Sequence, residues 1–220
     1  MNRELPKLTG LTLLTVLIGP PLLFVMLPQW LFGRHRPLAL EVVLLILFWA
    51  LWAFVVWIVV RHERLPLESI GLRRPDWSSL VAGVLLWLGL RFLLPLITEP
   101  LLSAFGTEGF DAGLNEVVRM PVWFRVIAGL TAGIVEETLY RGYAIERLGA
   151  ITGSRWVGGA ISSILFGVAH IPTWGVGFAL AVDLPFGIVM TVFYLWKRDL
   201  VSNMIAHGGG AVVVMLTEVP

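Results

Sequence analysis

The chain has 220 residues, of which 57% are hydrophobic and 14% are charged, with a mean hydropathy of +0.85. Soluble domains contain about 25% charged residues, so the composition excludes an ordinary water-soluble protein and predicts an all-α, polytopic transmembrane helix bundle. The formal net charge of +1 excludes a basic surface for nucleic acid, and the absence of cysteine excludes disulfides, a thiolate nucleophile and cysteine-bound zinc.

Uncharged runs predict the membrane spans in chain order. The predicted spans are about 9–32, 38–60, 77–98, 121 into the acidic motif near 136, 156–171, 175–196 and 200–217. Because a long or interrupted run can divide, we expect six to eight helices in a single transmembrane domain, 1–220. The first run is long enough to span and no small-residue cleavage site follows it, which favours a retained helix over a secretory signal.

The fifth and sixth spans contain helix-breaking features. The fifth is expected to stop at Ile171, because the residue before a proline disfavours the helical region. In the sixth, Asp183 and Pro185 predict either a helix break that lines a cavity or two short pieces. The drawn spans also place Glu136 and His170 at different depths, unless helix five begins deeper or helix four starts beyond the bilayer.

Arginine and lysine counts predict the orientation, since cytoplasmic loops carry the excess. The side of the N-terminus holds Arg3, Lys7, Arg61, Arg64, Arg73, Arg74, Arg141, Arg147, Arg155, Lys197 and Arg198. The opposite side holds Arg34, Arg36, Arg119 and Arg125. This bias predicts a cytoplasmic N-terminus.

The stretch "EETLYR" places three charges in an apolar run, where each costs roughly 3 kcal/mol on insertion scales. Glu137 and Arg141 have the i, i+4 spacing of a helical ion pair. Glu136 lies about 100° away around the helix and has no local cation, which leaves its carboxylate available for chemistry. Taken alone, the stretch fits a purely structural ion pair equally well.

Two histidines lie in apolar helical sequence, His170 in "ILFGVAH" and His207 in "NMIAHGGG". Each by itself fits a histidine that hydrogen-bonds a neighbouring helix. Together with the acidic pair they predict a polar cluster drawn from three helices, which is typical of a buried functional site. A glutamate and a histidine that share one water make a general base, and a further histidine can stabilise an oxyanion.

These motifs carry a family resemblance. "EETLYR" resembles the EExxxR motif, "FGVAH" resembles FxxxH, and His207 resembles the histidine of the third motif of the CPBP intramembrane glutamic endopeptidases, which include the type II CAAX prenyl proteases and the Abi proteins. The resemblance covers about 65–215, including "LESIGLRRPDW" before the third span. It implies a bundle of about eight helices with a polar intramembrane cavity open toward the cytoplasmic side.

The resemblance also implies roles for the matching residues. Glu136 and His170 would activate the attacking water, and Glu137 would support that pair. Arg141 would anchor Glu137, and Phe166 would pack beside the site.

One position departs from the family pattern. His207 would contribute to the oxyanion hole, but the asparagine or aspartate expected four residues later is Ala211 here. Asn203, four residues before His207 on the same helical face, is a candidate replacement.

The sequence thus predicts a metal-independent, glutamic-type endopeptidase without a cofactor in a prokaryotic plasma membrane. Its partners would be the lipid bilayer and a membrane-anchored protein or peptide substrate, with no nucleic acid. A zinc-dependent membrane protease is the nearest alternative, although the HExxH pattern is absent. A non-catalytic scaffold or immunity protein, and a transporter or proton relay, are the other classes. Substrate identity and oligomeric state are left open.

Overall fold

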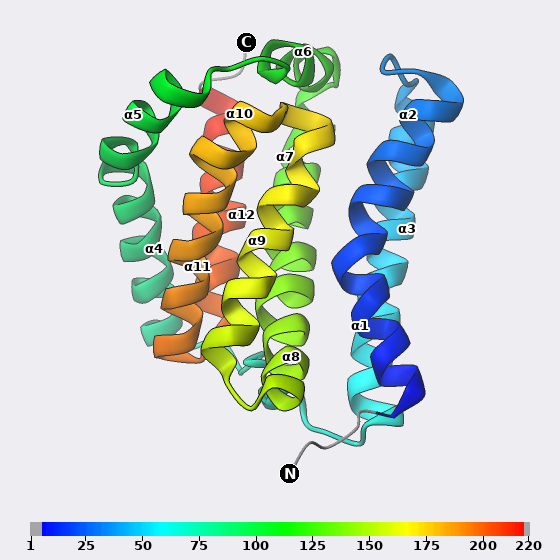
Figure 1. Ribbon diagram of the computed structural model, residues 1–220, viewed down its shortest axis with the longest axis vertical. Coiled ribbons are helices and arrows are strands. Elements are labelled where there is room, and N and C mark those ends of the chain that lie inside the picture. Colours follow the sequence, from blue (N-terminus) through cyan, green and yellow to red (C-terminus); the bar gives the residue numbers. More distant parts are fainter. Residues whose placement is uncertain (1–5, 218–220) are drawn as a thin grey trace.

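The computed structural model describes residues 6–217, and all its regular elements in that range are helices (Figure 1). Five helices are long and apolar enough to cross a membrane, and two bent helix pairs bring the number of described spans to as many as seven. The predicted all-α polytopic bundle is therefore confirmed, and the five to seven described spans overlap the predicted range of six to eight.

The first two spans form a hairpin beside the other helices (Figure 1). The first joins α1 (Lys7–Gly19), η1 (Pro20–Met26) and α2 (Leu27–Phe32), and the second joins α3 (Leu38–Trp57) and η2 (Ile58–His62). The stretch from Pro20 is wound as a π-helix, in keeping with the two adjacent prolines, which have no N–H to donate.

Only one half of the hairpin packs tightly against the bundle. Val16, Val55 and Ile58 are fully buried near the end that holds the N-terminus, whereas most of α3 before Val55 remains exposed or half-buried. The indole of Trp52 donates to Thr138 on the fourth span and fixes the hairpin there. The hairpin is thus tied to the bundle at one end and makes fewer contacts at the other.

The third span is bent by 41° between α4 (Trp77–Phe92) and α5 (Pro95–Phe105). The bend precedes Pro95, which has no N–H to continue the helical ladder. The Asp76 side chain caps the start of α4 by accepting from the Ser79 N–H at 2.7 Å. The preceding loop holds a short 3-10 helix, η3 (Leu67–Ile70), whose Ile70 is fully buried.

The fourth span is longer than predicted. After α6 (Phe110–Arg119), which crosses the top of the view in Figure 1, the chain turns by 119° into α7 (Val122–Thr131), η4 (Ala132–Ala144) and α8 (Ile145–Thr152). The helix does not end at the acidic motif, because η4 carries that motif through the centre of the bundle and α8 continues for two further turns.

The last three spans are α9 (Arg155–Trp174), then α10 (Val176–Phe178) with η5 (Ala179–Asp183) and α11 (Leu184–Lys197), and finally α12 (Leu200–Thr217). The predicted stop at Ile171 is wrong, because Pro172 is accommodated inside the last turn of α9, which ends at Gly175 with φ of +86°.

The predicted interruption of the sixth span is also absent. A π-helical turn carries the backbone through Asp183 and Pro185, with the Leu184 N–H bonding to the Ala179 carbonyl.

Helix η4 lies at the centre and approaches α12 closely. A Cβ at Gly133 would lie 2.4 Å from the backbone of Gly208. Such contacts between small residues allow membrane helices to pack backbone against backbone. Gly133 therefore sets the distance across which the site residues of η4 and α12 meet.

We expect Gly133→Ala to lower the Tm in detergent, because the added methyl forces the two backbones apart. The free energy of unfolding should fall by about 1–3 kcal/mol. Gly209→Ala on the same helix α12 is the matched control, since a Cβ there meets nothing within 4 Å. A thermal unfolding series checks this prediction. Equal Tm values for the two variants would contradict the close approach.

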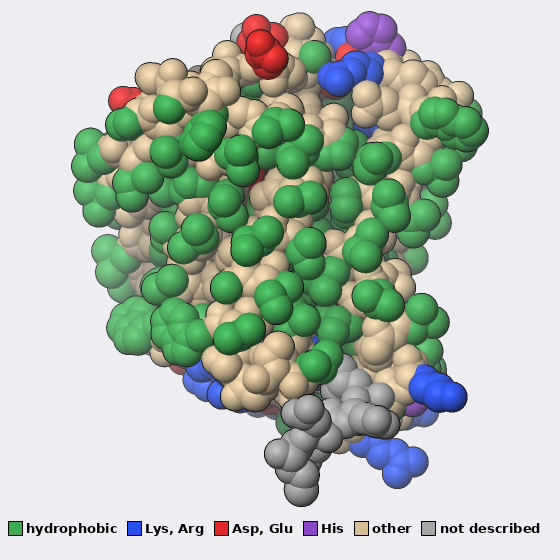
Figure 2. Space-filling view, viewed as in Figure 1, with side chains coloured by type: hydrophobic (Ala, Val, Ile, Leu, Met, Phe, Trp, Pro, Cys, Tyr) green, Lys and Arg blue, Asp and Glu red, His purple; other side chains and the backbone are tan. Residues whose placement is uncertain are grey.

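Hydrophobic side chains cover the middle of the molecule and charges gather at its two ends (Figure 2). We call the end with Lys7 and the turns at Gly153 and Asp199 the N-terminal end, and the end with α6 and the turn at Gly33 the distal end. Arg141 is fully buried between them, so it does not count toward the charge bias, and Arg3 lies outside the described residues. The cytoplasmic N-terminus stays a prediction.

Candidate active site

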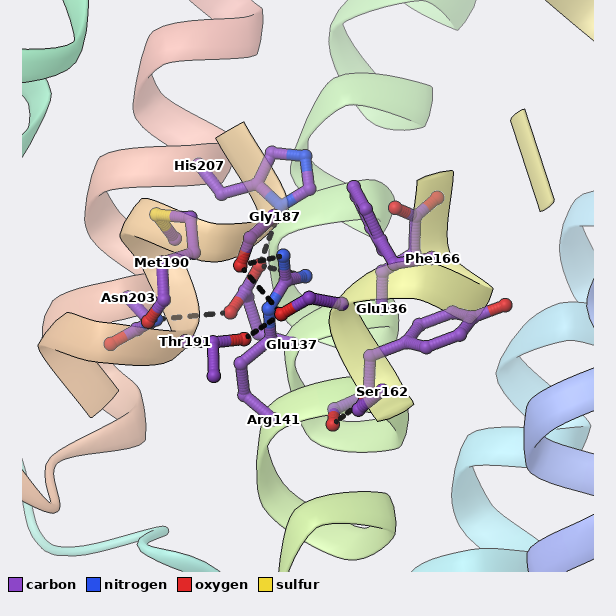
Figure 3. Close-up of polar contacts among 12 residues, drawn as sticks. Glu136, Glu137, Arg141, Ser162, Phe166, Gly187, Met190, Thr191, Asn203 and His207 are labelled. Carbon is purple, nitrogen blue, oxygen red and sulfur yellow. Dashed lines mark hydrogen bonds and ion pairs between the residues drawn. The ribbon is translucent and has the colours of Figure 1, made fainter. Parts of the chain in front are cut away.

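The acidic motif lies on η4, where its two glutamates point in different directions (Figure 3). Glu137 and Arg141 form the ion pair that their spacing predicts, with Arg141 Nη1 donating to Glu137 Oε1 at 2.9 Å. Both side chains are almost completely buried, at 0% and 1% exposure. A charge in such surroundings is tolerated only when it is paired and hydrogen-bonded.

Further donors complete the surroundings of the Glu137 carboxylate (Figure 3). His207 Nδ1 lies 2.8 Å from Oε1, and Asn203 Nδ2 donates to Oε2 at 3.2 Å. The second amide hydrogen bond of Asn203 goes to the Met190 carbonyl at 2.9 Å. With an arginine, a histidine and an amide around it, Glu137 joins η4 to α12 and has little capacity left for substrate chemistry.

Glu136 faces a different partner. Its Oε2 lies 3.9 Å from Nε2 of His170 on α9, and this buried oxygen accepts no hydrogen bond from the described residues. The two side chains are partly accessible, at 18% and 21% exposure. A separation of 3.9 Å is too long for a direct hydrogen bond and suits a water molecule that bonds to both groups.

The other ring nitrogen of His170 fixes its tautomer. Nδ1 lies 2.8 Å from the Phe166 carbonyl, an acceptor, so Nδ1 must carry the hydrogen. In the neutral ring Nε2 then presents a lone pair toward Glu136. The arrangement places two proton acceptors, a carboxylate and an imidazole, close enough for one water beside them to bond to both.

Phe166 lies between the two halves of the cluster and is 1% exposed. Its ring is 4.1 Å from the Arg141 guanidinium carbon and 4.4 Å from the centroid of His170. Such stacking of a guanidinium on an aromatic face stabilises the cation in a dry interior. Phe166 therefore packs beside both Arg141 and His170, where the family resemblance places it.

The depth difference expected from the drawn spans is not found. Glu136 lies about 24 Å from the end of its helix at Thr152, and His170 lies about 22 Å from the start of α9 at Arg155, at 1.5 Å per residue. The levels match because the fourth helix continues beyond the acidic motif to the same end at which α9 begins.

The structure also explains why Ala211 can stand where the family pattern has an amide. A Cβ at Gly129 on α7 would lie 3.2 Å from the Ala211 Cβ, so α7 and α12 are in close contact there and a larger side chain would force them apart. Asn203 faces the bundle interior, fully buried. Its role as a replacement amide in catalysis stays a prediction.

Sequence reasoning assigned no role to several residues around the site. Asp183 is within electrostatic range of Glu136, His170 and His207, and its buried Oδ2 accepts no hydrogen bond from the described residues. Gly187 accepts from Arg141 Nη2 at 3.4 Å through its carbonyl. The only sequence signal for Asp183 was an acid two residues before a proline in an apolar run. The contact with the Gly187 carbonyl has no sequence signal, because every residue has a backbone carbonyl.

Among the described residues, no group of three or more histidines and acids has a geometry that could hold a metal ion. Glu137 is instead bonded to arginine, histidine and amide donors, and Glu136 and His170 lie 3.9 Å apart. Metal independence itself stays a prediction.

Comparison with protein families decides the assignment. Residues 118–213 match the model of the type II CAAX prenyl endopeptidase Rce1-like family. The match covers 96 of the 220 residues, and over this segment the chain is similar to that family. The matched segment contains every residue of the polar cluster, from Glu136 to His207.

The Rce1-like family is a protease family, and its model covers a shorter part of this chain than the resemblance suggested. The match begins at residue 118, so the segment "LESIGLRRPDW" lies outside it. No curated protein and no solved structure matches the chain. The apolar helices indicate an integral membrane protein, and its segment 118–213 is similar to a protease family.

Proposed function

We propose that this chain hydrolyses a peptide bond of a membrane-anchored protein or peptide with a water molecule activated by Glu136 and His170. The observation that carries the proposal is the 3.9 Å separation between Glu136 Oε2 and His170 Nε2, which are both proton acceptors in the neutral tautomer of His170. A water held there donates to both acceptors, so its own lone pair points outward to a carbonyl carbon.

The proposed reaction proceeds in two steps. The water oxygen attacks the scissile carbonyl carbon while Glu136 or His170 takes its proton, which gives a tetrahedral oxyanion. Collapse of this intermediate breaks the C–N bond, and the proton held by the base passes to the departing amine. The products are a new carboxylate and a new amine, and no metal enters the balance.

His207 is proposed to stabilise the oxyanion. Its Nδ1 hydrogen bonds to Glu137, so Nε2 can donate only when the ring is protonated on both nitrogens. Glu137 supplies the counter-charge for such an imidazolium, and Arg141 holds Glu137 in place. The oxyanion would then neutralise the additional positive charge as it forms.

Cleavage in heavy-oxygen water tests the proposal. Purified protein in lipid nanodiscs is mixed with candidate membrane-anchored peptides in H₂¹⁸O, and the products are analysed by mass spectrometry. We expect one heavy oxygen in the carboxylate of the N-terminal fragment, and an undiminished rate in the presence of a chelator. Stoichiometric zinc with activity lost on chelation would overturn the metal-free reaction, and full biological activity of a Glu136→Gln variant would favour a non-catalytic role.

We further propose a prokaryotic plasma membrane and a cytoplasmic N-terminus, supported by the excess of arginine and lysine at the N-terminal end. Reporter fusions at the turns near Gly33 and Gly153 test the orientation. Activity at Gly153 of a reporter that works only outside the cytoplasm would overturn the proposed orientation.

A further inference from the structure

Asp183 stands inside the sixth span, at the end of η5, and has no role in the reaction proposed above. It is half-buried, as are Glu136, His170 and His207. Its buried Oδ2 accepts no hydrogen bond from the described residues. Because a buried carboxyl oxygen without a donor is unfavourable, such a group within a membrane helix points to a function.

The contacts between α9 and α11 place Asp183 level with His170. The two helices are neighbours and run in opposite directions (Figure 1). A Cβ at Gly187 on α11 would lie 3.1 Å from the ring of Phe166 on α9. His170 is one turn after Phe166, and Asp183 is one turn before Gly187. The next level of the same interface therefore holds both His170 and Asp183.

The contacts between α11 and α12 place Asp183 level with Ala211. The ring centroids of Phe186 and His207 are 4.9 Å apart. Because these helices also run in opposite directions, three residues before Phe186 and four residues after His207 lie at about the same level. Those positions are Asp183 and Ala211. At this level α12 presents a methyl group, and α11 presents a carboxyl group.

The titratable groups that act electrostatically on Asp183 come from three helices. They are Glu136 of η4, His170 of α9 and His207 of α12. Helix α5, which also packs against η5, adds no charged group within that range among the described residues. With both histidines neutral, an ionised Asp183 would face the Glu136 carboxylate without a cation. Two carboxyl groups in one partly buried site do not readily ionise together, so the pair is expected to retain one proton.

We propose that Asp183, as a neutral carboxyl, donates a hydrogen bond to the oxygen of the scissile carbonyl and forms part of the oxyanion hole beside His207. The proton stays on Asp183 throughout, so the attack of water and the cleavage of the C–N bond balance as described above. The acceptor of this hydrogen bond, and the choice of Glu136 as the ionised acid, rest on the proposed function.

A neutral carboxyl suits this role better than His207 alone. Nε2 of His207 can donate only when its ring is protonated on both nitrogens, whereas a neutral carboxyl donates without any added charge. The hydrogen bond from Asp183 strengthens as the carbonyl oxygen becomes negative, so it stabilises the tetrahedral intermediate more than the bound substrate.

Two variants of similar size separate a hydrogen-bond donor from an ionised acid. Asp183→Asn retains N–H donors, and Asp183→Leu has no polar side-chain atom. Rates are measured in lipid nanodiscs with a membrane-anchored peptide that the parent protein cleaves. We expect kcat to fall about 100- to 1,000-fold in Asp183→Leu, the range for the loss of one oxyanion donor. Asp183→Asn should stay within about tenfold of the parent kcat, and KM should change little in either variant.

Thermal unfolding and a control variant separate this effect from misfolding. Asp183→Leu removes an unpartnered buried oxygen, so its Tm should not fall below that of the parent protein. Asp111→Asn is the control, because Asp111 is an exposed acid on α6 at the distal end, and it should change neither kcat nor Tm.

Infrared spectroscopy tests the proton on Asp183 without any substrate. The C=O stretch of a neutral carboxyl is separate from the carboxylate bands and shifts in D₂O. At neutral pH we expect this band in the parent protein and in Asp111→Asn, and its loss in Asp183→Asn. A band that is lost in Glu136→Gln and unchanged in Asp183→Asn would put the proton on Glu136 and overturn the inference.

The rates can overturn the inference as well. It is wrong if Asp183→Asn is as slow as Asp183→Leu, or if Asp183→Leu retains more than about a tenth of the parent kcat. A carboxyl band from Asp183 in a protein that cleaves no peptide would sustain the neutral acid while the proposed hydrolysis fails. Cleavage by a protein without that band would do the reverse.

Discussion

Glu136→Gln is expected to lower kcat for peptide hydrolysis by about 10³-fold or more, in line with the usual contribution of a general base and the loss of the water's proton acceptor. The amide keeps the size of the side chain and removes its basicity. Because Glu136 is partly accessible and its only described ion-pair partner is His170, the Tm should stay close to that of the parent protein. Cleavage rates check the expected fall in kcat, and thermal unfolding of the same preparation checks the unchanged Tm.

The adjacent glutamate provides a matched control. Glu137→Gln removes a charge that Arg141, His207 and Asn203 all contact, so it should lower the Tm as well as the rate. His170→Ala combined with Glu136→Gln should be little worse than either change alone, because the two groups act on the same water. A Glu136→Gln variant with more than a tenth of the parent kcat would contradict the assignment of the base.

Arg141→Met is expected to destabilise the protein by about 3–5 kcal/mol, because it leaves the Glu137 carboxylate buried without its main counter-charge. The guanidinium also stacks on Phe166 and bonds to the Gly187 carbonyl, and both contacts are lost. Unfolding in detergent, monitored by denaturant or by temperature, measures the loss.

Arg155→Met is the exposed counterpart, with a side chain that is 57% exposed and also pairs with a glutamate. It should cost less than about 1 kcal/mol. The double variant Glu137→Gln with Arg141→Met should recover part of the stability that Arg141→Met alone loses, since it removes both buried charges. Equal losses of stability in Arg141→Met and Arg155→Met would contradict the burial of the Glu137–Arg141 ion pair.

The sequence by itself determined the class of fold and the partners within the acidic motif. Twenty apolar residues in a row can satisfy their backbone in lipid only as a helix, so composition alone predicts the bundle. The i, i+4 spacing likewise predicts the Glu137–Arg141 pair, because neighbours on a helix surface follow from local geometry.

Only the tertiary structure decided how the spans run through their prolines and which residues meet between helices. Pro172 and Pro185 lie inside helices because a terminal turn and a π-turn absorb their missing N–H groups, and a local rule cannot foresee this. The continuation of the fourth helix to Thr152 brings Glu136 level with His170. Asn203 meets Glu137 because Gly133 lets η4 and α12 touch, and such a contact depends on packing between segments about seventy residues apart.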